Sequence, residues 1–312
     1  MGSPKSAFIV TKPFQYINAT NIADTNIRDL YLIPNFNNFD TFYDAIKEKS
    51  KFWNLIYIFK TKELALLRII FIQRRYVNIY LDSDFGFILR FLLFFFIKVK
   101  IYVYEEGVAS YTLNLRNNET FESRVKSFLD RLFFGNTWSG SAYKTSGIYL
   151  YHKTAFLKLL NYNTGNKVIL NFNKKFLFHL LDINEIDHLY ENINFNNYKE
   201  KDVLLYLTAG VINKNIYPIL SIYPKYCKIL KIHPFLKNIS STHFDESIDS
   251  SLPAELLIYK LSSIAKSLVV VHESSAAILN VVNDIDLIEI NIGEAKYTHN
   301  FNYLKSLFIG NQ

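Results

Sequence analysis

Three short polar motifs stand directly after apolar, strand-like runs. In chain order they are Tyr104-Glu105-Glu106-Gly107, His233-Pro234 and Ser274-Ser275. The preceding runs, at 100–103, 227–232 and 268–271, are rich in β-branched and aromatic residues, as buried strands are. Open α/β sheets bind ligands at the carboxyl ends of their strands. The pattern therefore predicts that acid, imidazole and hydroxyl groups lie where a ligand would bind.

The acidic pair can supply a general base. A carboxylate near a second acid and partly out of water has a raised pKa, which makes it a better base. Glu105 and Glu106 are neighbours, so in extended backbone only one can face a site while the other packs or binds backbone. We expect Glu106 to be the base, with Glu105 as the alternative, and Gly107 to allow the sharp turn. A solvated turn carboxylate or a helix cap is the non-functional interpretation.

The other two motifs suit a phosphate. Pro234 bars helix at His233, and an imidazole at a strand end can donate to a phosphate whose charge grows as a bond breaks. Ser274 and Ser275 precede the helical run 276–279, where hydroxyls and free N–H groups can form an anion site. Plain N-capping is the alternative for the two serines. Together these groups are the parts needed to move a sugar off a nucleotide.

Composition limits the class of protein. The 312 residues are enough for two domains, and 50% hydrophobic with 20% charged residues suits a folded chain. A net charge of +7 favours an anionic partner, although ordinary soluble enzymes carry a similar excess. The Lys and Arg residues are scattered and no RNA-binding signature appears, so no nucleic acid partner is expected. Cys227 is the only cysteine, which excludes an intrachain disulfide and predicts a core residue.

Strand and helix patterns alternate along the first half, which predicts βαβ units and a parallel sheet. A polar helix is expected over 120–134, followed by a Gly/Ser/Asn loop over 134–141. Polar density rises again near 164–166, where we place the boundary between a domain of residues 1–165 and one of residues 166–312. In the first half, the expected strands are 6–10, 29–33, 53–59, 76–81 and 99–104, and the expected helices are 14–23, 39–49 and 62–73. In the second half, the patterned segments are 202–207, 226–232, 256–265, 267–271, 276–281 and 287–290.

The most apolar window, residues 85–97, is shorter than the ~20 residues that span a bilayer, and Arg90 interrupts it. As a helix it would be apolar nearly all round, which predicts a buried crossover between two strands. The alternative is an interfacial helix with Lys98 and Lys100 near lipid headgroups. The N-terminus does not read as a signal peptide, so a cytoplasmic location is expected, with the inner face of the cytoplasmic membrane as a peripheral site.

The set of motifs resembles the bacterial sialyltransferases of GT-B architecture, which carry an acidic pair with Gly, then HP, then SS. Residues 9–15 are similar to the T-P-x-Q loop that often opens those enzymes, although Lys12 between Thr11 and Pro13 departs from it. Residues 252–255 are similar to their cytidine-binding segment. The resemblance extends from Ile9 to Ser275.

This resemblance implies an α/β fold of GT-B type, with two Rossmann-like domains facing a central cleft. The N-terminal domain would carry the base on the acceptor side, and the C-terminal domain would bind the donor. The implied activity is inverting, metal-independent transfer of sialic acid from CMP-sialic acid to a glycan acceptor, in the synthesis of capsule or lipooligosaccharide. No cofactor is implied. The implied catalytic residues are Glu106, Glu105 and His233, and the implied donor-binding residues are Thr11, Gln15, Thr208, Gly210, Pro234, Glu255, Ser274 and Ser275.

Other interpretations stay open. Asp82 and Asp84 can be read as a metal-binding D-x-D, which belongs to a different class of glycosyltransferase. A GT-B transferase with another activated donor, of the Kdo or capsule phosphotransferase type, would also place His and Ser at strand ends. A non-enzymatic module that binds an acidic glycan or nucleic acid is the third alternative. Glu255 has its own simple interpretation, a first-turn carboxylate that the helix dipole favours.

Overall fold

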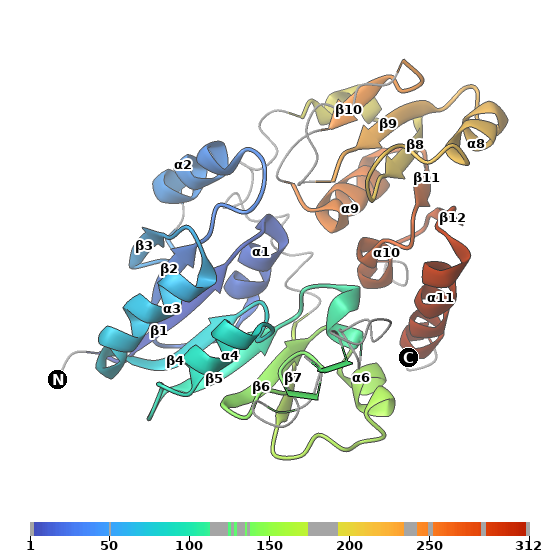
Figure 1. The fold of residues 1–312 in the computed structure, drawn as a ribbon. Helices are drawn as coiled ribbons and strands as arrows, with labels where there is room; N and C mark the ends of the chain where they lie inside the picture. Colours follow the sequence, from blue (N-terminus) through green and yellow to red (C-terminus); the bar gives the residue numbers. More distant parts are fainter. Residues whose placement is uncertain are drawn as a thin grey trace. The chain divides into compact units, whose positions relative to one another are not determined.

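The chain forms two compact units, which Figure 1 colours along the sequence. Unit 1 comprises Met1–Asn35 and Ser50–Lys174, and unit 2 comprises Phe36–Lys49 and Lys175–Gln312. The structure is a computed structural model. It describes residues 3–49, 51–112, 124–125, 128–129, 135, 138–173, 193–233, 242–248, 252–281 and 285–309.

Unit 1 is built on a seven-stranded sheet in the order β3-β2-β1-β4-β5-β6-β7, with every neighbouring pair parallel. The carboxyl-terminal halves of the central strands are buried on both faces, so residues 7–10 and 79–81 read as continuous apolar runs rather than alternating ones. The strand order reverses between β1 and β4, which creates a topological switch point at their carboxyl ends. The strands are β1 Lys5–Val10, β2 Ile27–Leu32, β3 Leu55–Ile58, β4 Tyr76–Leu81, β5 Lys100–Tyr104, β6 Thr145–Leu150 and β7 Val168–Asn171.

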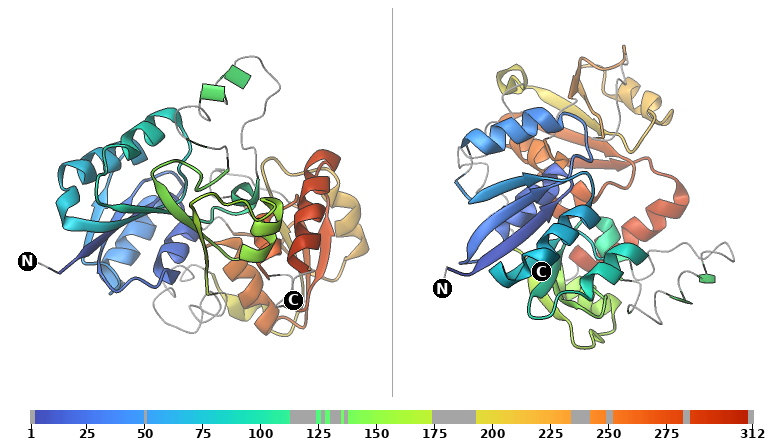
Figure 2. Two further views of the ribbon diagram at one scale, coloured as in Figure 1. Left: turned by 90° about the horizontal axis from the view of Figure 1, so that it is seen from below. Right: turned by 60° about the vertical axis from the view of Figure 1, so that its left-hand side comes forward.

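Helices cover both faces of this sheet. Right-handed crossovers require α1 on one face and α3 with α4 on the other, and Figure 2 shows that arrangement. Pro13 starts α1 at a position that tolerates proline, and Thr61 caps α3 by accepting from Leu64 N at 3.3 Å. The helices are α1 Pro13–Asn21, α3 Lys62–Phe71, α4 Phe87–Leu93 and α6 Lys153–Leu159, with short 3₁₀ turns η1 Gln73–Arg75 and η2 Val108–Tyr111.

Unit 2 repeats the scheme with five parallel strands in the order β10-β9-β8-β11-β12. Its core includes Leu204, Leu230, Val269 and Val271, and its switch point lies between β8 and β11. The strands are β8 Asp202–Leu207, β9 Cys227–Lys231, β10 Glu246–Ile248, β11 Ser267–His272 and β12 Ile288–Asn291; the helices are α2 Phe39–Lys49, η4 Phe195–Tyr198, α8 Ile216–Ile222, α9 Ala254–Ile264, α10 Ala276–Val281 and α11 Ala295–Ile309.

The predicted α/β class with parallel sheets is confirmed. Two burial predictions are wrong. The apolar window does form a helix, α4, but Phe87, Ile88 and Phe91 on it are at least half exposed. Cys227 begins β9 and is half-buried rather than part of the core. Among the described residues, no helix is long and apolar enough to cross a membrane. Most of the helix expected over 120–134 lies outside the described residues.

Candidate functional site

The switch point of unit 1 brings the loops after β1 and β4 together. Thr11 Oγ1 lies 2.7 Å from Asp82 Oδ2 and 2.6 Å from Gln15 Oε1, and Thr11 N donates to Gln15 Oε1 at 2.8 Å. All three side chains are buried. Gln15 Nε2 makes no hydrogen bond within the described part of the chain. Thr11 and Gln15 therefore hold each other at the sheet edge, and the Gln15 amide keeps a donor without a partner among the described residues.

Lys62 joins this edge, and sequence reasoning missed it. Its Nζ lies 2.6 Å from Asp82 Oδ1, and Asp82 is fully buried. Burial lowers the pKa of Lys62, but the charge of Asp82 and, more weakly, that of Glu106 raise it further than burial lowers it. The ammonium therefore stays charged. A signal was present in the sequence: Lys62 opens a helix, where the dipole disfavours a cation.

The two acids after β5 have different surroundings, as the alternation predicts. Glu105 is 1% exposed, and its Oε2 accepts from Tyr111 OH at 2.5 Å and from Tyr151 N at 2.8 Å. Burial and the Glu105 charge raise the pKa of Tyr111 well above its usual value, so this hydroxyl keeps the proton that it donates. Glu105 thus ties the β5 end to the chain after β6. It has the contacts of a structural carboxylate.

Glu106 is held in place but remains accessible. Its Oε1 lies 2.5 Å from Lys12 Nζ, and the two side chains are 27% and 32% exposed. The Glu106 amide donates to Ser110 Oγ at 2.8 Å. Gly107 turns the chain at a φ of 104°, the conformation that glycine was expected to supply. Lys12, the departure from the opening loop, thus reaches from the loop after β1 to the acid after β5.

Asp84, the second acid of the D-x-D pair, serves another loop. Its Oδ1 accepts from Gly140 N, and its Oδ2 accepts from Ala142 N and Thr145 Oγ1, each at 2.9 Å. The side chain is fully buried. These bonds fix the approach to β6. Asp82 and Asp84 therefore have separate structural partners.

At the switch point of unit 2, the turn after β11 is locked to the loop after β12. Ser274 has a φ of 58°, and its amide donates to Asn291 Oδ1 at 3.1 Å. Asn291 Oδ1 also accepts from Gly293 N at 2.9 Å. A Cβ on Gly293 would lie 2.8 Å from Ser274 Oγ, so glycine permits this close approach. The position of the Ser-Ser turn is thus fixed by its neighbour strand.

His272 fixes the second serine. Its Nδ1 accepts from Ser275 N at 3.1 Å, which places the ring proton on Nε2, 3.1 Å from Glu289 Oε1. Burial raises the pKa of Glu289, but His272 and Lys305 lower it by more, so Glu289 is an anion. The amides of both serines are therefore used inside the protein. The expectation that they are free to bind a phosphate is wrong. Ser275 Oγ lies 3.4 Å from Ala277 N, as a capping residue does, and both serine side chains are half-buried.

Four polar side chains are buried near this edge. Thr208 follows β8, Lys231 ends β9, Glu255 lies in the first turn of α9, and Asn280 lies in α10; each is 3–7% exposed. Burial raises the pKa of Glu255 to about 7, although the Asn280 amide and the Lys231 ammonium oppose the rise. Thr208 Oγ1 has no hydrogen-bond partner among the described residues. Sequence reasoning missed Lys231, whose signal is a cation that ends an otherwise apolar strand.

The remaining predicted residues lie at the same edge of unit 2 or outside the description. His233 is half-buried and stands two residues after β9, and Gly210 is half-buried in the loop after β8. Pro234 lies outside the described residues. The structure thus gathers Thr208, His233 and Ser275 at strand ends of one sheet, and Thr11, Gln15 and the acidic pair at strand ends of the other.

Comparison with known proteins identifies the fold. No protein-family model matches the sequence, and no curated protein matches it either. Among solved structures, the chain is similar to a putative UDP-N-acetylglucosamine 2-epimerase from Listeria monocytogenes (TM-score 0.57, 10% identity, 100% of this chain and 89% of that chain). It is also similar to the UDP-N-acetylglucosamine 2-epimerase from Rickettsia bellii (0.53, 12%, 94% and 80%) and to the wall teichoic acid polymerase TagF (0.51, 10%, 98% and 82%).

These likenesses cover nearly the whole chain at low identity, so they show the fold and nothing finer. The chain has a GT-B-like fold with two parallel Rossmann-like sheets, as the sequence predicted.

Proposed function

We propose that this protein is an inverting glycosyltransferase that moves sialic acid from CMP-sialic acid to a hydroxyl of a glycan. The observation that carries the proposal is the placement of Glu106. This carboxylate stands accessible at the carboxyl edge of the unit 1 sheet, oriented by Lys12, while Glu105 beside it is buried and committed to Tyr111 and Tyr151. A fixed and accessible acid is what removal of an acceptor proton requires.

The donor half of the proposal rests on unit 2. Glu255, with a pKa of about 7, can either donate or accept a hydrogen bond near neutral pH, which suits a nucleoside. Thr208 Oγ1 offers a buried hydroxyl without a partner among the described residues. A dinucleotide-type sheet binds its ligand at the switch point where Thr208 and the Ser-Ser turn lie. His233 would donate to the phosphate.

The reaction then runs as one displacement. Glu106 takes the proton from the acceptor hydroxyl, and that oxygen forms a bond to the anomeric carbon on the face opposite the phosphate. The bond between the anomeric carbon and the phosphate oxygen breaks, and CMP leaves with the electron pair. His233 offsets the charge that grows on the phosphate. The product has inverted anomeric configuration.

A second candidate is a transferase of the same fold with a different activated donor. It is favoured by the likeness to two UDP-N-acetylglucosamine 2-epimerases and to a wall teichoic acid polymerase, whose names concern other ligands than CMP-sialic acid. The Ser-Ser turn also favours neither donor, because its amides are already bonded.

Thermal-shift titration tests which nucleotide the protein binds, and the transfer assay then tests the donor sugar. A ligand at 100 times its Kd stabilises a protein by about 2.7 kcal/mol, which raises the Tm by several degrees. We expect CMP to give this shift and UMP, UDP and GDP to give none. The Glu255→Gln variant should lose part of the CMP shift, while Glu246→Gln, on the edge strand β10, should keep it.

Incubation with labelled CMP-sialic acid and a panel of glycan acceptors then tests the chemistry. A labelled glycan of inverted configuration supports the proposal. A uridine nucleotide that shifts the Tm in place of CMP, together with no sialyl product, would establish the second candidate instead.

A further inference from the structure

One face of unit 1 carries an unusual concentration of exposed apolar side chains. Of the 24 large hydrophobic side chains that are exposed among the described residues, ten lie between residues 64 and 97. Phe71 is 83% exposed and Ile97 is 79% exposed. We call this set the α3/α4 face: Leu64, Leu67, Phe71, Val77, Phe87, Ile88, Phe91, Phe94, Phe95 and Ile97.

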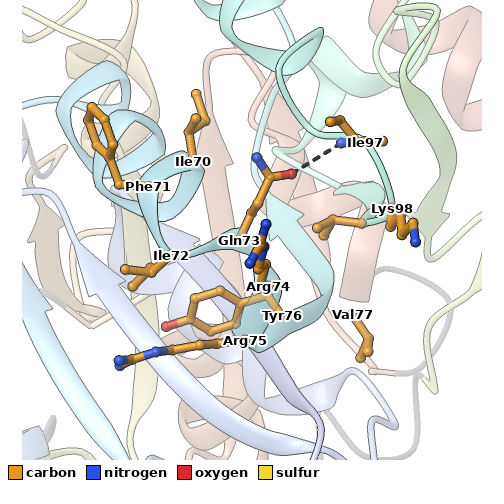
Figure 3. A pocket seen from close by; sticks show the side chains of 11 residues that line it. Ile70, Phe71, Ile72, Gln73, Arg74, Arg75, Tyr76, Val77, Ile97 and Lys98 are labelled. Atoms are coloured by element: carbon orange, nitrogen blue, oxygen red, sulfur yellow. Dashed lines mark hydrogen bonds between the residues drawn. The ribbon is translucent and has the colours of Figure 1, made fainter.

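The α3/α4 face is held together by its own contacts. Helix α3 packs against α4. The side chain of Gln73 in η1 donates to Phe95 O at 3.1 Å and accepts from Ile97 N at 3.2 Å, the second bond being drawn in Figure 3. Gln73 thus ties η1, which follows α3, to the turn after α4. The rings of Phe91 and Phe95 meet edge to face with centroids 5.3 Å apart. A hollow of about 940 Å³ opens beside this link, lined by residues 70–77 and 97–99.

The charges on this face that are exposed are positive, and Glu63 in the first turn of α3 is half-buried. Arg68, Arg74, Arg75, Lys98 and Lys100 are exposed. Between residues 64 and 100, every one of which the structure describes, the only carboxylates are Asp82 and Asp84, and both are fully buried. Figure 3 shows Arg74, Arg75 and Lys98 beside the hollow.

We propose that the α3/α4 face docks on the surface of an anionic lipid bilayer. Aromatic and aliphatic side chains can enter the boundary between headgroups and acyl chains, while Arg and Lys pair with the lipid phosphates. A second copy of the chain fits less well, because a two-fold contact would place this cationic rim against itself. The inference does not depend on the reaction that the protein catalyses.

Sedimentation with vesicles tests this surface on the full chain. The vesicles are pure phosphatidylcholine, or phosphatidylcholine with 30% phosphatidylglycerol. The first double variant combines Phe71→Ser with Ile97→Ser. Its control combines Val211→Ser with Ile222→Ser, because Val211 and Ile222 are apolar residues of unit 2 that are 87% and 70% exposed. The second double variant combines Arg74→Ser with Arg75→Ser. Its control combines Lys214→Ser with Lys225→Ser, because both lysines are exposed in unit 2. Thermal unfolding confirms that each variant folds.

We expect the protein to sediment with the anionic vesicles and to release at high salt. Each lost cation should lower the partition coefficient about fivefold, and the Phe71 and Ile97 pair should lower it tenfold or more. The matched variants should bind as the parent does. Failure to bind anionic vesicles at low salt overturns the proposal. An equal loss in the Lys214 and Lys225 variant also overturns it, because it would mean non-specific attraction by net charge, and so does an equal loss in the Val211 and Ile222 variant. A dimer in light scattering that only the Phe71 and Ile97 pair abolishes would assign the face to a second copy.

Discussion

Replacement of glutamate by glutamine should lower turnover at Glu106 and lower the stability of the fold at Glu105. In Glu106→Gln the side chain keeps its size and loses its basicity. A positioned carboxylate base typically contributes 10²–10⁴-fold, so we expect turnover to fall by about that factor. Stability should change little, because a partly exposed ion pair such as Lys12–Glu106 contributes only about 0–1 kcal/mol. Affinity for CMP should be unchanged.

Glu105→Gln should instead weaken the fold. Two donors, Tyr111 OH and Tyr151 N, converge on the buried Glu105 Oε2. A hydrogen bond to a charged group contributes about 1.5–3 kcal/mol, against about 1 kcal/mol for a neutral one. Loss of charge at two bonds, offset in part by the easier burial of an amide, gives a loss of roughly 2 kcal/mol. The Tm should drop by several degrees, with turnover below the transition lowered only mildly.

The assay measures both quantities on both variants. Release of CMP is followed at saturating CMP-sialic acid and acceptor, and unfolding is followed by calorimetry on the same samples. An inactive Glu105→Gln with unchanged Tm, beside an active Glu106→Gln, would mean that the base is the other acid of the pair. Full activity in both variants would refute the assignment of the base to this motif.

Further predictions concern the donor side and the buried charges. His233→Ala should lose on the order of 10²–10³ in turnover while its Tm is kept, because the imidazole acts on leaving-group charge; unchanged turnover in the folded variant contradicts that role. A chelator should leave transfer intact, since the proposed phosphate contact is made by His233; activity lost in chelator and restored by manganese would contradict the metal-independent reaction. Lys62→Met should destabilise the protein by on the order of 3 kcal/mol in urea unfolding, because Asp82 would be left buried without its cation, and Lys62→Arg should restore most of the loss. Burial raises the pKa of Glu255 from 4.5 to about 7, so between those pH values the folded protein binds more protons than the unfolded chain, and its stability falls as the pH rises through this window. Glu255→Gln should therefore gain stability relative to the parent at pH 8 and not at pH 5, and an equal difference at both pH values would contradict the buried acid.

The sequence was informative for the elements that are buried on both faces. Strands β1, β4, β8 and β11 each contain a run of buried apolar residues, so their positions and the parallel sheet could be predicted. Strand β6 could not, because its sequence contains Gly147, which usually argues against a strand interior. In the structure a Cβ at Gly147 would lie 2.2 Å from Val168 O, so the glycine is what lets β6 and β7 approach. Close backbone contact between distant segments leaves no local pattern.

The same limit applies to the site. Residues that directly follow strands were located correctly, because a parallel sheet brings the carboxyl ends of its strands to one edge. What each side chain does there depends on partners from other strands, which spacing along the chain does not report. The amides of the Ser-Ser turn were expected to be free. In the structure, the register between β11 and β12 places Asn291 where its Oδ1 accepts a hydrogen bond from the amide of Ser274. Lys12 was a departure from the opening loop, and its partner Glu106 lies 94 residues away. Lys12 does not match the motif, yet its ammonium pairs with Glu106, the acid proposed as the base. A residue that departs from a motif can therefore orient a residue that carries the chemistry.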